Sequence, residues 1–405
     1  MLRPARDYHG CSVHWGRINL QFMAQGRGRA GLGAAALVVV LATPGCMTQR
    51  SVQGATCEDV GPALTVPTAA EVPNEINVLA LSAGGPWGGF GIGFLNGWSQ
   101  ASRNGGMPRP RFDIAVGVST GAMFVTHAFL GAEHDEAIRH QLFTLSTEKV
   151  YRRRPILASL AGDSVASTHP LRTRLERVIT PALLDLVADA WIQQGRRLAV
   201  IAVDMDCGKP QLLDLTAVAV QRDRPDRVSR YIDYLMASSA SPVAFPPVFV
   251  DGRMLVDGAL RQHIPFPSQI AALMAGRESP GPRVNLYLIV NSPRLAVPQC
   301  VTDHVLLVAL RTSDVWTGER ANDSLALAMT DAIRRGWMAR YVTPDGDLCQ
   351  PVPPSEDYFN PAFMQCQFEY GRRLALEDGS SWQVRIDTLS PFEIKPVTQR
   401  HPCAR

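Results

Sequence analysis

The chain alternates short apolar runs with helix-like segments, and this alternation limits its fold more than any other feature. Apolar runs that suit buried strands cover residues 76–82, 112–118, 197–203, 211–215 and 285–292. Helix-like segments cover residues 90–102, 120–130, 132–147, 171–194, 228–237 and 322–342. Such an alternation predicts an α/β fold, with a mainly parallel central sheet and helices on both faces. The functional site of this kind of sheet lies beyond the carboxyl ends of the strands.

Composition excludes several classes of protein. With 405 residues, 46% hydrophobic and 19% charged, the chain is too apolar for a disordered protein and too mixed for a multi-pass membrane protein. A net charge of +3 gives no electrostatic reason to expect nucleic acid as a partner. The basic triplet Arg152, Arg153 and Arg154 is read as a solvated loop, with a contact to anionic lipid as the alternative.

The N-terminal region has the pattern of a targeting signal. The apolar run of residues 30–45 follows Arg27 and Arg29 and ends directly before Cys46, as in a secretory signal. A signal that ends in Gly45-Cys46 resembles a bacterial lipobox, in which the cysteine is lipidated, although Thr43 and Pro44 depart from that pattern. We expect residues 1–45 to be a signal with a mis-called start, 46–73 a tether, and 74–405 a single folded domain.

This pattern implies an exported bacterial lipoprotein of the cell envelope, anchored through Cys46 at the periplasmic face of the outer membrane. Ordinary signal cleavage and an uncleaved apolar segment remain alternatives. Without Cys11 and Cys46, six cysteines remain, which allows up to three disulfides in an oxidising compartment or a set of buried thiols. No C-x-x-C or H-E-x-x-H spacing occurs, so we expect neither a metal nor another cofactor.

The sequence Gly117-Val118-Ser119-Thr120-Gly121 has the G-x-S-x-G form of a nucleophile elbow. It follows an apolar run and opens a helix-like segment, which is the context that the motif requires. A serine at a tight strand-to-helix turn needs neighbours without a Cβ atom. The helix that starts there also directs unpaired N–H groups and its positive dipole end at the site.

A glycine-rich loop directly follows the first apolar run, with the sequence Ala83-Gly84-Gly85-Pro86-Trp87-Gly88-Gly89. Backbone N–H groups can converge there on one anion, as in an oxyanion hole or a phosphate cradle. The phosphate-binding motifs do not fit, because a Walker loop needs Gly-Lys where Gly89 is followed by Phe90. The loop therefore predicts an oxyanion hole, with a tight packing turn as the alternative.

A third motif, Asp257-Gly258-Ala259, ends another apolar run. A carboxylate at a strand end is well placed to accept a proton from a serine hydroxyl. The other Asp-Gly pair, Asp251-Gly252, lies between residues 247–250 and 253–256 and predicts a hairpin turn.

Together and in this order, the three motifs resemble those of the patatin-like phospholipase family. The segment of residues 237–248 and the stretches near 359–376 also resemble family members. The resemblance implies a three-layer patatin-like sandwich that cleaves lipid acyl esters with a Ser–Asp dyad, with Ser119 as nucleophile and Asp257 as base. It implies an oxyanion hole formed by the backbone of Gly84, Gly85, Pro86, Trp87 and Gly88. The remaining motif positions are Gly117, Gly121, Gly258 and Ala259.

The loop departs from the family pattern, because Trp87 stands where the family has Arg or Lys and Ala83 replaces a glycine. A contact to a lipid phosphate from that basic residue would be lost. One alternative is therefore a non-catalytic lipid-binding lipoprotein of the same fold. Another is a Ser-His-Asp esterase, for which the histidines after Asp257 are His263, His304 and His401. Contacts to the substrate chain are expected from Phe90, Phe94 and residues 245–247, with core packing as the alternative.

Overall fold

The structure is a computed structural model. It describes residues 57, 74–155, 159, 162–274, 282–293, 300–301, 303, 305–344, 348–349, 353, 357–377 and 381–384. The predicted signal, most of the tether, Cys46, His304 and His401 lie outside the described residues.

The described residues contain one eight-stranded sheet, with the order β10-β9-β1-β2-β5-β8-β7 and with β6 also paired to β5. Strands β10, β9, β1, β2 and β5 are parallel, whereas β6 and β8 pair with β5 in the antiparallel sense. The strands are β1 (Glu75–Leu81), β2 (Ile114–Val118), β5 (Arg197–Asp204), β6 (Lys209–Asp214), β7 (Val248–Val250), β8 (Arg253–Asp257), β9 (Arg283–Ile289) and β10 (Met338–Val342). The predicted α/β fold with a mainly parallel sheet is confirmed.

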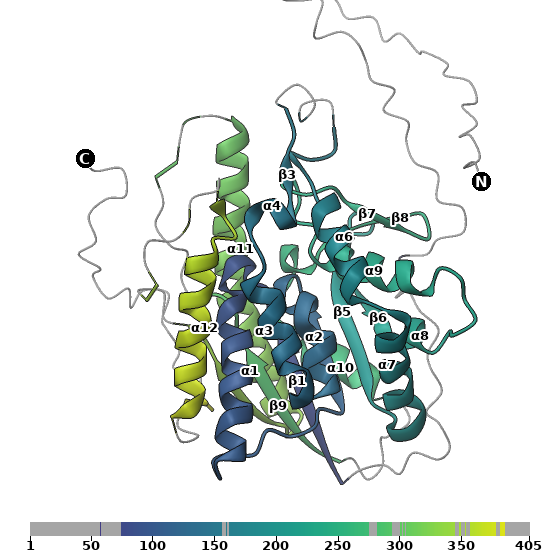
Figure 1. The fold of residues 1–405 in the computed structure, drawn as a ribbon, viewed down its shortest axis with the longest axis vertical. Coiled ribbons are helices and arrows are strands. Elements are labelled where there is room, and N and C mark those ends of the chain that lie inside the picture. Colours follow the sequence, from purple (N-terminus) through teal and green to yellow (C-terminus); the bar gives the residue numbers. More distant parts are fainter. Residues whose placement is uncertain are drawn as a thin grey trace, which may run out of the picture. The chain divides into compact units, whose positions relative to one another are not determined.

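Helices cover both faces of the sheet (Figure 1). The helices are α1 (Gly88–Arg103), α2 (Thr120–Leu130), α3 (Asp135–Phe143), α4 (Thr147–Val150), α6 (His169–Val178), α7 (Pro181–Gln194), α8 (Leu215–Ala219), α9 (Arg227–Ser238), α10 (Pro267–Leu273), α11 (Val305–Arg334) and α12 (Pro361–Leu376). A small ribbon pairs β3 (Arg152–Arg153) with β4 (Ala166–Ser167).

Alternate residues of the strands belong to two separate apolar cores. Leu79 and Leu81 of β1 pack with α1, α2, α7, α9 and α12, while Val78 and Ala80 of the same strand pack with α10 and α11. This division follows from the period of two along a strand, which directs successive side chains to opposite faces. The architecture is a three-layer α/β/α sandwich.

Helix α12 packs closely along α1, which itself leads out of the glycine-rich loop (Figure 1). A Cβ atom on Gly93 of α1 would lie 2.0 Å from the carbonyl oxygen of Phe368, and one on Gly371 of α12 would lie 2.1 Å from that of Phe90. The absence of these Cβ atoms allows the two backbones to approach. The C-terminal stretches that carried part of the resemblance therefore support the loop.

Three predicted helices have different boundaries. The predicted helix over 322–342 is wrong at its end, because Gly336 adopts φ 71° and the chain then forms β10 beside β9. The segment 171–194 is divided into α6 and α7, since Thr180 caps the second helix by accepting a hydrogen bond from the Leu183 N–H and Pro181 follows it. The segment 132–147 likewise breaks after Phe143.

The predicted hairpin at Asp251-Gly252 is present and joins β7 to β8. Both residues have positive φ, 49° and 79°, as a two-residue turn between antiparallel strands requires.

Candidate active site

Strand β5 brings Ser119 and Asp257 together, because β2 and β8 lie end to end along one of its edges. Strand β6 pairs with residues 199–204 of β5 and occupies the other edge. On the shared edge, Val118 at the end of β2 opposes Ile201, and Asp257 at the end of β8 opposes Ala202. The last residues of the two strands therefore meet, at the carboxyl end of the parallel part of the sheet.

Ser119 occupies a strained turn between β2 and α2. Its backbone has φ 51° and ψ −119°, outside the regions that residues with a Cβ atom ordinarily adopt. The turn is tight, since a Cβ atom on Gly121 would lie 2.5 Å from the carbonyl oxygen of Leu81 and one on Gly117 would lie 2.8 Å from the amide nitrogen of Ala122. The G-x-S-x-G pattern thus has the geometry that its glycines predicted.

Two adjacent serines at the end of α9 hold the backbone of Ser119. The Ser119 N–H donates to Ser238 Oγ at 3.1 Å, and Ser239 Oγ donates to the Ser119 carbonyl oxygen at 3.0 Å. Ser238 Oγ also donates to the carbonyl oxygen of Ile201 at 2.6 Å. Both serines lie in the segment 237–248, and the sequence predicted no role for either of them in the site. The sequence feature that could have indicated their role is that two serines follow each other at the end of a helix-like segment.

Ser119 Oγ donates a hydrogen bond to Asp257 Oδ2 at 2.6 Å. The other carboxylate oxygen, Asp257 Oδ1, accepts from the Ala259 N–H at 2.8 Å. Gly258 allows this close turn, because a Cβ atom there would lie 2.5 Å from the carbonyl oxygen of Ile201. The motif Asp257-Gly258-Ala259 therefore aims its carboxylate directly at the predicted nucleophile.

Asp257 is almost completely buried, with 5% of its surface exposed. Burial raises the pKa of its carboxyl group from 3.8 to about 7, against the opposing effect of the hydrogen bonds from Ser119 and Ala259. A carboxylate with a pKa near 7 is a far better proton acceptor than an ordinary aspartate. It still exists largely in its ionised form at slightly alkaline pH.

The glycine-rich loop lies beside the Ser119 turn. Thr120 Oγ1 donates to the carbonyl oxygen of Gly85 at 3.0 Å. Within the described residues, the N–H groups of Gly84 and Gly85 make no hydrogen bond. Such unpaired N–H groups next to a nucleophile are what an oxyanion hole needs.

The other predicted members of the oxyanion hole do not offer free donors. Pro86 has no N–H group. The Trp87 N–H donates to the carbonyl oxygen of Gly84 at 3.0 Å, and the Gly88 N–H donates to that of Gly85. These bonds close a short 3₁₀ turn over Gly85–Trp87, which limits the available loop donors to Gly84 and Gly85.

Asn291, directly after β9, fixes the position of the loop. Its backbone N–H donates to Ser82 Oγ at 2.7 Å and its Nδ2 donates to the Ser82 carbonyl oxygen at 2.8 Å. A Cβ atom on Gly84 would lie 1.7 Å from the Asn291 carbonyl oxygen, so only glycine fits at position 84. From the other side, a Cβ atom on Gly85 would lie 2.6 Å from the Tyr358 hydroxyl oxygen. Neither support could be predicted from the sequence, because Asn291 and Tyr358 come from distant parts of the chain.

Trp87 is buried and does not face the site. Its ring packs edge-on against Phe363 of α12, with 5.0 Å between ring centroids and 6% of the residue exposed. The residue at the position where the family has a basic side chain therefore anchors the loop to α12.

His263 does not take part in a triad with Ser119 and Asp257. Both of its ring nitrogens are buried, neither has a hydrogen-bond partner among the described residues, and burial lowers its pKa to about 4. Its backbone carbonyl accepts from the Ala83 N–H at 3.2 Å. His127, on α2, is also buried, and its Nε2 lies 3.4 Å from Gln141 Nε2.

The predicted contacts to a substrate chain are only partly available. Phe90 and Phe94 are completely buried in the core between α1 and α12, so the expectation that they line the site is wrong. Phe245 is half-buried and packs on Tyr151 at 5.4 Å between ring centroids.

Among the described residues, no group of three His, Cys, Asp or Glu side chains could hold a metal ion. No helix in the described part of the chain is both long and apolar enough to cross a membrane.

Comparison with known proteins connects this site to a family. A family model described as patatin-like phospholipase matches residues 79–269, a range that includes Ser119, Asp257 and the glycine-rich loop. No curated protein matches the chain. Among solved structures, the chain is similar to VipD from Legionella pneumophila, with 12% identity, 77% of this chain and 68% of that chain covered, and a TM-score of 0.31. That TM-score is too low to bear on function. The family match supports a lipid acyl hydrolase in general.

Proposed function

The chain carries a patatin-like phospholipase domain over residues 79–269, and on this premise we propose that it hydrolyses carboxylic esters of lipids through an acyl-enzyme on Ser119. The observation that carries the proposal is the 2.6 Å hydrogen bond between Ser119 Oγ and the buried carboxylate of Asp257. A strained nucleophile in contact with a carboxylate of raised pKa is costly to maintain, which supports a catalytic role over a structural one.

In the first step, Asp257 Oδ2 accepts the hydroxyl proton as Ser119 Oγ attacks the acyl carbonyl carbon. The carbonyl oxygen becomes an oxyanion, for which we expect the unpaired N–H groups of Gly84 and Gly85 and the N-terminal end of α2 to be the donors. When the intermediate collapses, Asp257 returns the proton to the departing alkoxide. The alcohol leaves, and the acyl group remains on Ser119.

In the second step, water replaces the alcohol. Asp257 accepts a proton from the attacking water, and it returns this proton to Ser119 Oγ as the acyl–Ser119 bond breaks and the carboxylic acid leaves. The same carboxylate thus acts as base and acid in turn, and a pKa near 7 suits both roles.

The substrate is a lipid ester whose head group is not held by a basic residue of the loop. Trp87 is buried against α12 at the position where the family has Arg or Lys. We therefore expect the loop to bind the reacting carbonyl, with head-group selection left to other parts of the site. Neutral esters and phospholipids should be cleaved at more similar rates than in members with the basic residue.

A chromogenic acyl ester tests the proposal. Ser119→Ala and Asp257→Asn should each lower kcat/KM by at least about a thousandfold, because members of one catalytic unit cannot act alone. Asp251→Asn is the matched control, since it changes the other Asp-Gly pair, is exposed, and leaves a residue that tolerates positive φ. Activity that survives Ser119→Ala in folded protein would contradict the proposal. Loss of activity in His263→Ala, with its fold intact, would instead favour a Ser-His-Asp esterase.

We also propose that the chain is an exported cell-envelope lipoprotein anchored through Cys46. The disulfides Cys57–Cys207 and Cys349–Cys366 support export, since such bonds persist in oxidising compartments. Mass spectrometry of the mature N-terminus should find a lipidated Cys46. An unmodified Cys46, or cleavage elsewhere, would contradict the anchor and leave the proposed chemistry intact.

A further inference from the structure

Three consecutive residues at the end of α9 contact both members of the proposed dyad. Ser238 and Ser239 bind the backbone of Ser119 at 3.1 and 3.0 Å. The carbonyl oxygen of the next residue, Ala240, accepts from the Asp257 N–H at 3.0 Å. We call these three residues the clamp. The proposed nucleophile and the proposed base are thus held by one short segment, in addition to the strands that carry them.

The hydroxyl group of Ser238 has a fixed direction. It donates its one proton to the Ile201 carbonyl oxygen at 2.6 Å, so toward the Ser119 N–H it acts only as an acceptor. Ser238 is 0% exposed, so bulk water does not compete for either bond. The Ser119 N–H is therefore already occupied, which leaves the oxyanion to other donors.

Ile201 connects this hydrogen bond to the turn of Asp257. Its carbonyl oxygen accepts from Ser238 Oγ, and a Cβ atom on Gly258 would lie 2.5 Å from the same oxygen. A continuous path of contacts therefore runs from the Ser119 N–H through Ser238 and Ile201 to the residue directly after Asp257. The positions of the two dyad residues are linked through this path as well as through the clamp.

The clamp acts on a residue whose backbone conformation is unfavourable by itself. The angles of Ser119, φ 51° and ψ −119°, persist only where the surroundings impose them. Ser238 binds the N–H group and Ser239 binds the carbonyl group of this one residue, so its backbone is held from both sides. A change in these angles would redirect the Cα–Cβ bond, and with it the Oγ atom that lies 2.6 Å from Asp257 Oδ2.

Helix α9 is itself fixed to the helix that follows Ser119. Tyr231 of α9 and Thr126 of α2 share a buried hydrogen bond of 2.9 Å between their hydroxyl groups. Tyr231 and Leu235, one turn further along α9, both belong to the apolar core on that face of the sheet. The clamp is therefore the end of a firmly packed helix.

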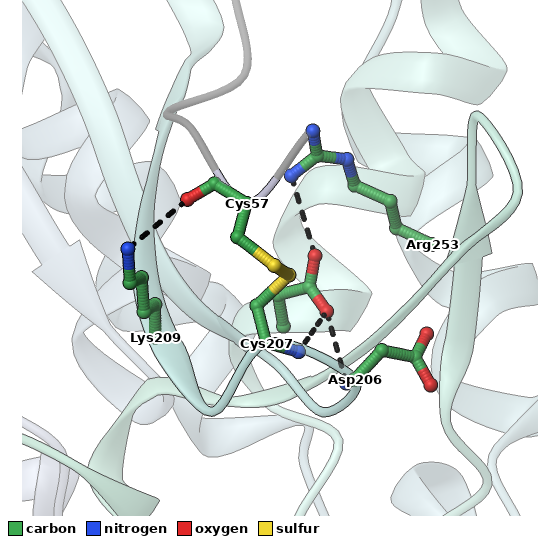
Figure 2. Close-up of a disulfide and its surroundings, with 6 residues drawn as sticks. Cys57, Asp206, Cys207, Lys209 and Arg253 are labelled. Carbon is green, nitrogen blue, oxygen red and sulfur yellow. Dashed lines mark hydrogen bonds and ion pairs between the residues drawn. A yellow bond between two sulfur atoms is a disulfide. The ribbon is translucent and has the colours of Figure 1, made fainter. Parts of the chain in front are cut away.

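The strand that carries Asp257 is held at its other end by separate contacts. Arg253, the first residue of β8, donates to Asp204 Oδ2 at 3.3 Å, and Asp204 Oδ1 accepts from two N–H groups of the turn that carries Cys207 (Figure 2). The disulfide between Cys57 and Cys207 is attached to the same turn. None of these contacts involves the clamp, so loss of the clamp should leave β8 in the sheet.

We propose that Ser238 and Ser239 are positioning residues for the proton transfer of the proposed function, on which this inference rests. The clamp sets the distance between Ser119 Oγ and Asp257 Oδ2. This distance matters more in a dyad than in a triad, because no third side chain lies between nucleophile and base to compensate for a displacement. A displacement of reacting atoms by about 1 Å can cost about a hundredfold in rate.

Kinetics of full-length protein on a soluble chromogenic ester test this role, with rates expressed per serine titrated to completion with a fluorophosphonate. Ser238→Ala should lower kcat by about tenfold to a hundredfold and change KM by less than about twofold, because buried Ser238 does not reach the substrate. Ser239→Ala should also lower kcat, and Ser239→Thr, which keeps the hydroxyl group, should restore it.

Ser241→Ala is the matched control, because it makes the same change directly after the clamp. The Ser241 hydroxyl makes no hydrogen bond with the described residues. This variant should keep the parent's kcat within about twofold. An equal loss of kcat in Ser241→Ala would overturn the specific role of the clamp.

The pH–rate profile separates positioning from a general loss of stability. Burial raises the pKa of Asp257 to about 7, and the hydrogen bond from Ser119 opposes this rise. Without the clamp this hydrogen bond weakens, so the pH of half-maximal rate should move to a higher value in Ser238→Ala. Partial unfolding would reduce the amount of active enzyme and leave that pH unchanged.

Amide hydrogen exchange tests the clamp without turnover. The Ser119 N–H should exchange at least about tenfold faster in Ser238→Ala than in the parent, because it loses its acceptor, and at the parent's rate in Ser241→Ala. Unchanged kcat and an unchanged pH midpoint in folded, active Ser238→Ala would overturn the positioning role while the proposed function stands. If the parent cleaves no ester, the proposed function fails, and equal exchange in Ser238→Ala would overturn the clamp as well.

Discussion

Asp257 holds a negative charge in a buried position, and Asp257→Asn removes that charge while it keeps the shape of the side chain. An asparagine can retain both contacts, because its Oδ1 can accept from the Ala259 N–H and its Nδ2 can donate to Ser119 Oγ. Basicity is lost, so we expect turnover to fall severely. At alkaline pH, however, the free energy of unfolding of Asp257→Asn should gain relative to that of the wild-type protein.

The sign follows from the pKa of Asp257, which is about 7 in the folded protein and 3.8 without burial. Between these values the folded state binds more protons than the unfolded state, so the wild-type protein loses stability as pH rises from about 4 to about 7. Each pH unit across that interval costs about 1.4 kcal/mol, which gives about 4 kcal/mol at pH 8 and about 1–2 kcal/mol at pH 5. Asp257→Asn has no such loss.

Urea unfolding of both proteins at pH 5 and pH 8 measures the effect. The stability of Asp257→Asn relative to wild type should increase by about 2–3 kcal/mol from pH 5 to pH 8. Any fixed cost of the substitution cancels in this comparison, because it is the same at both pH values. A relative stability that is independent of pH, or that decreases with pH, would refute the argument that Asp257 is destabilised by burial of its charge.

Further predictions follow from the same site. Ester hydrolysis should rise with pH and reach half of its plateau near pH 7, because Asp257 must be ionised to accept the proton; a pH–rate profile with a midpoint near 4 would count against this. Gly84→Ala should abolish activity or folding, because its Cβ atom would lie 1.7 Å from the Asn291 carbonyl oxygen, and thermal unfolding with an activity assay separates the two outcomes. Gly336→Ala, where the described residues leave open space and positive φ is the obstacle, should cost about 1 kcal/mol and leave activity unchanged; lost activity in this folded variant would show that the assay responds to glycine substitutions far from the loop.

Much of the site could be read from the sequence because its key residues are local signals at the ends of strands. Ser119 and Asp257 each follow an apolar run, and each has glycine neighbours that a tight turn requires. Ser119 follows a parallel strand, so the sequence could indicate its place at the carboxyl edge of the sheet. Asp257 ends β8, which is antiparallel to β5, so only the structure shows that the two residues meet. Their roles rested on the family resemblance.

What the sequence could not provide are the contacts between distant segments. Ser238 and Ser239 hold Ser119, Asn291 supports Gly84, and Tyr358 lies against Gly85, each across a large separation in the chain. Local patterns carry no information about which side chains a sheet brings together. The hydrogen bonding within the loop is likewise invisible in its composition.

By itself, the sequence determined the alternation of strands and helices, the three motifs and their order, since these depend on the period of apolar residues and on turn chemistry. Tertiary structure decided that Phe90 and Phe94 are core residues, that only Gly84 and Gly85 have unpaired loop N–H groups, and that residues 338–342 form an edge strand. It also decided the pKa of Asp257, because burial depends on every element packed around the carboxylate.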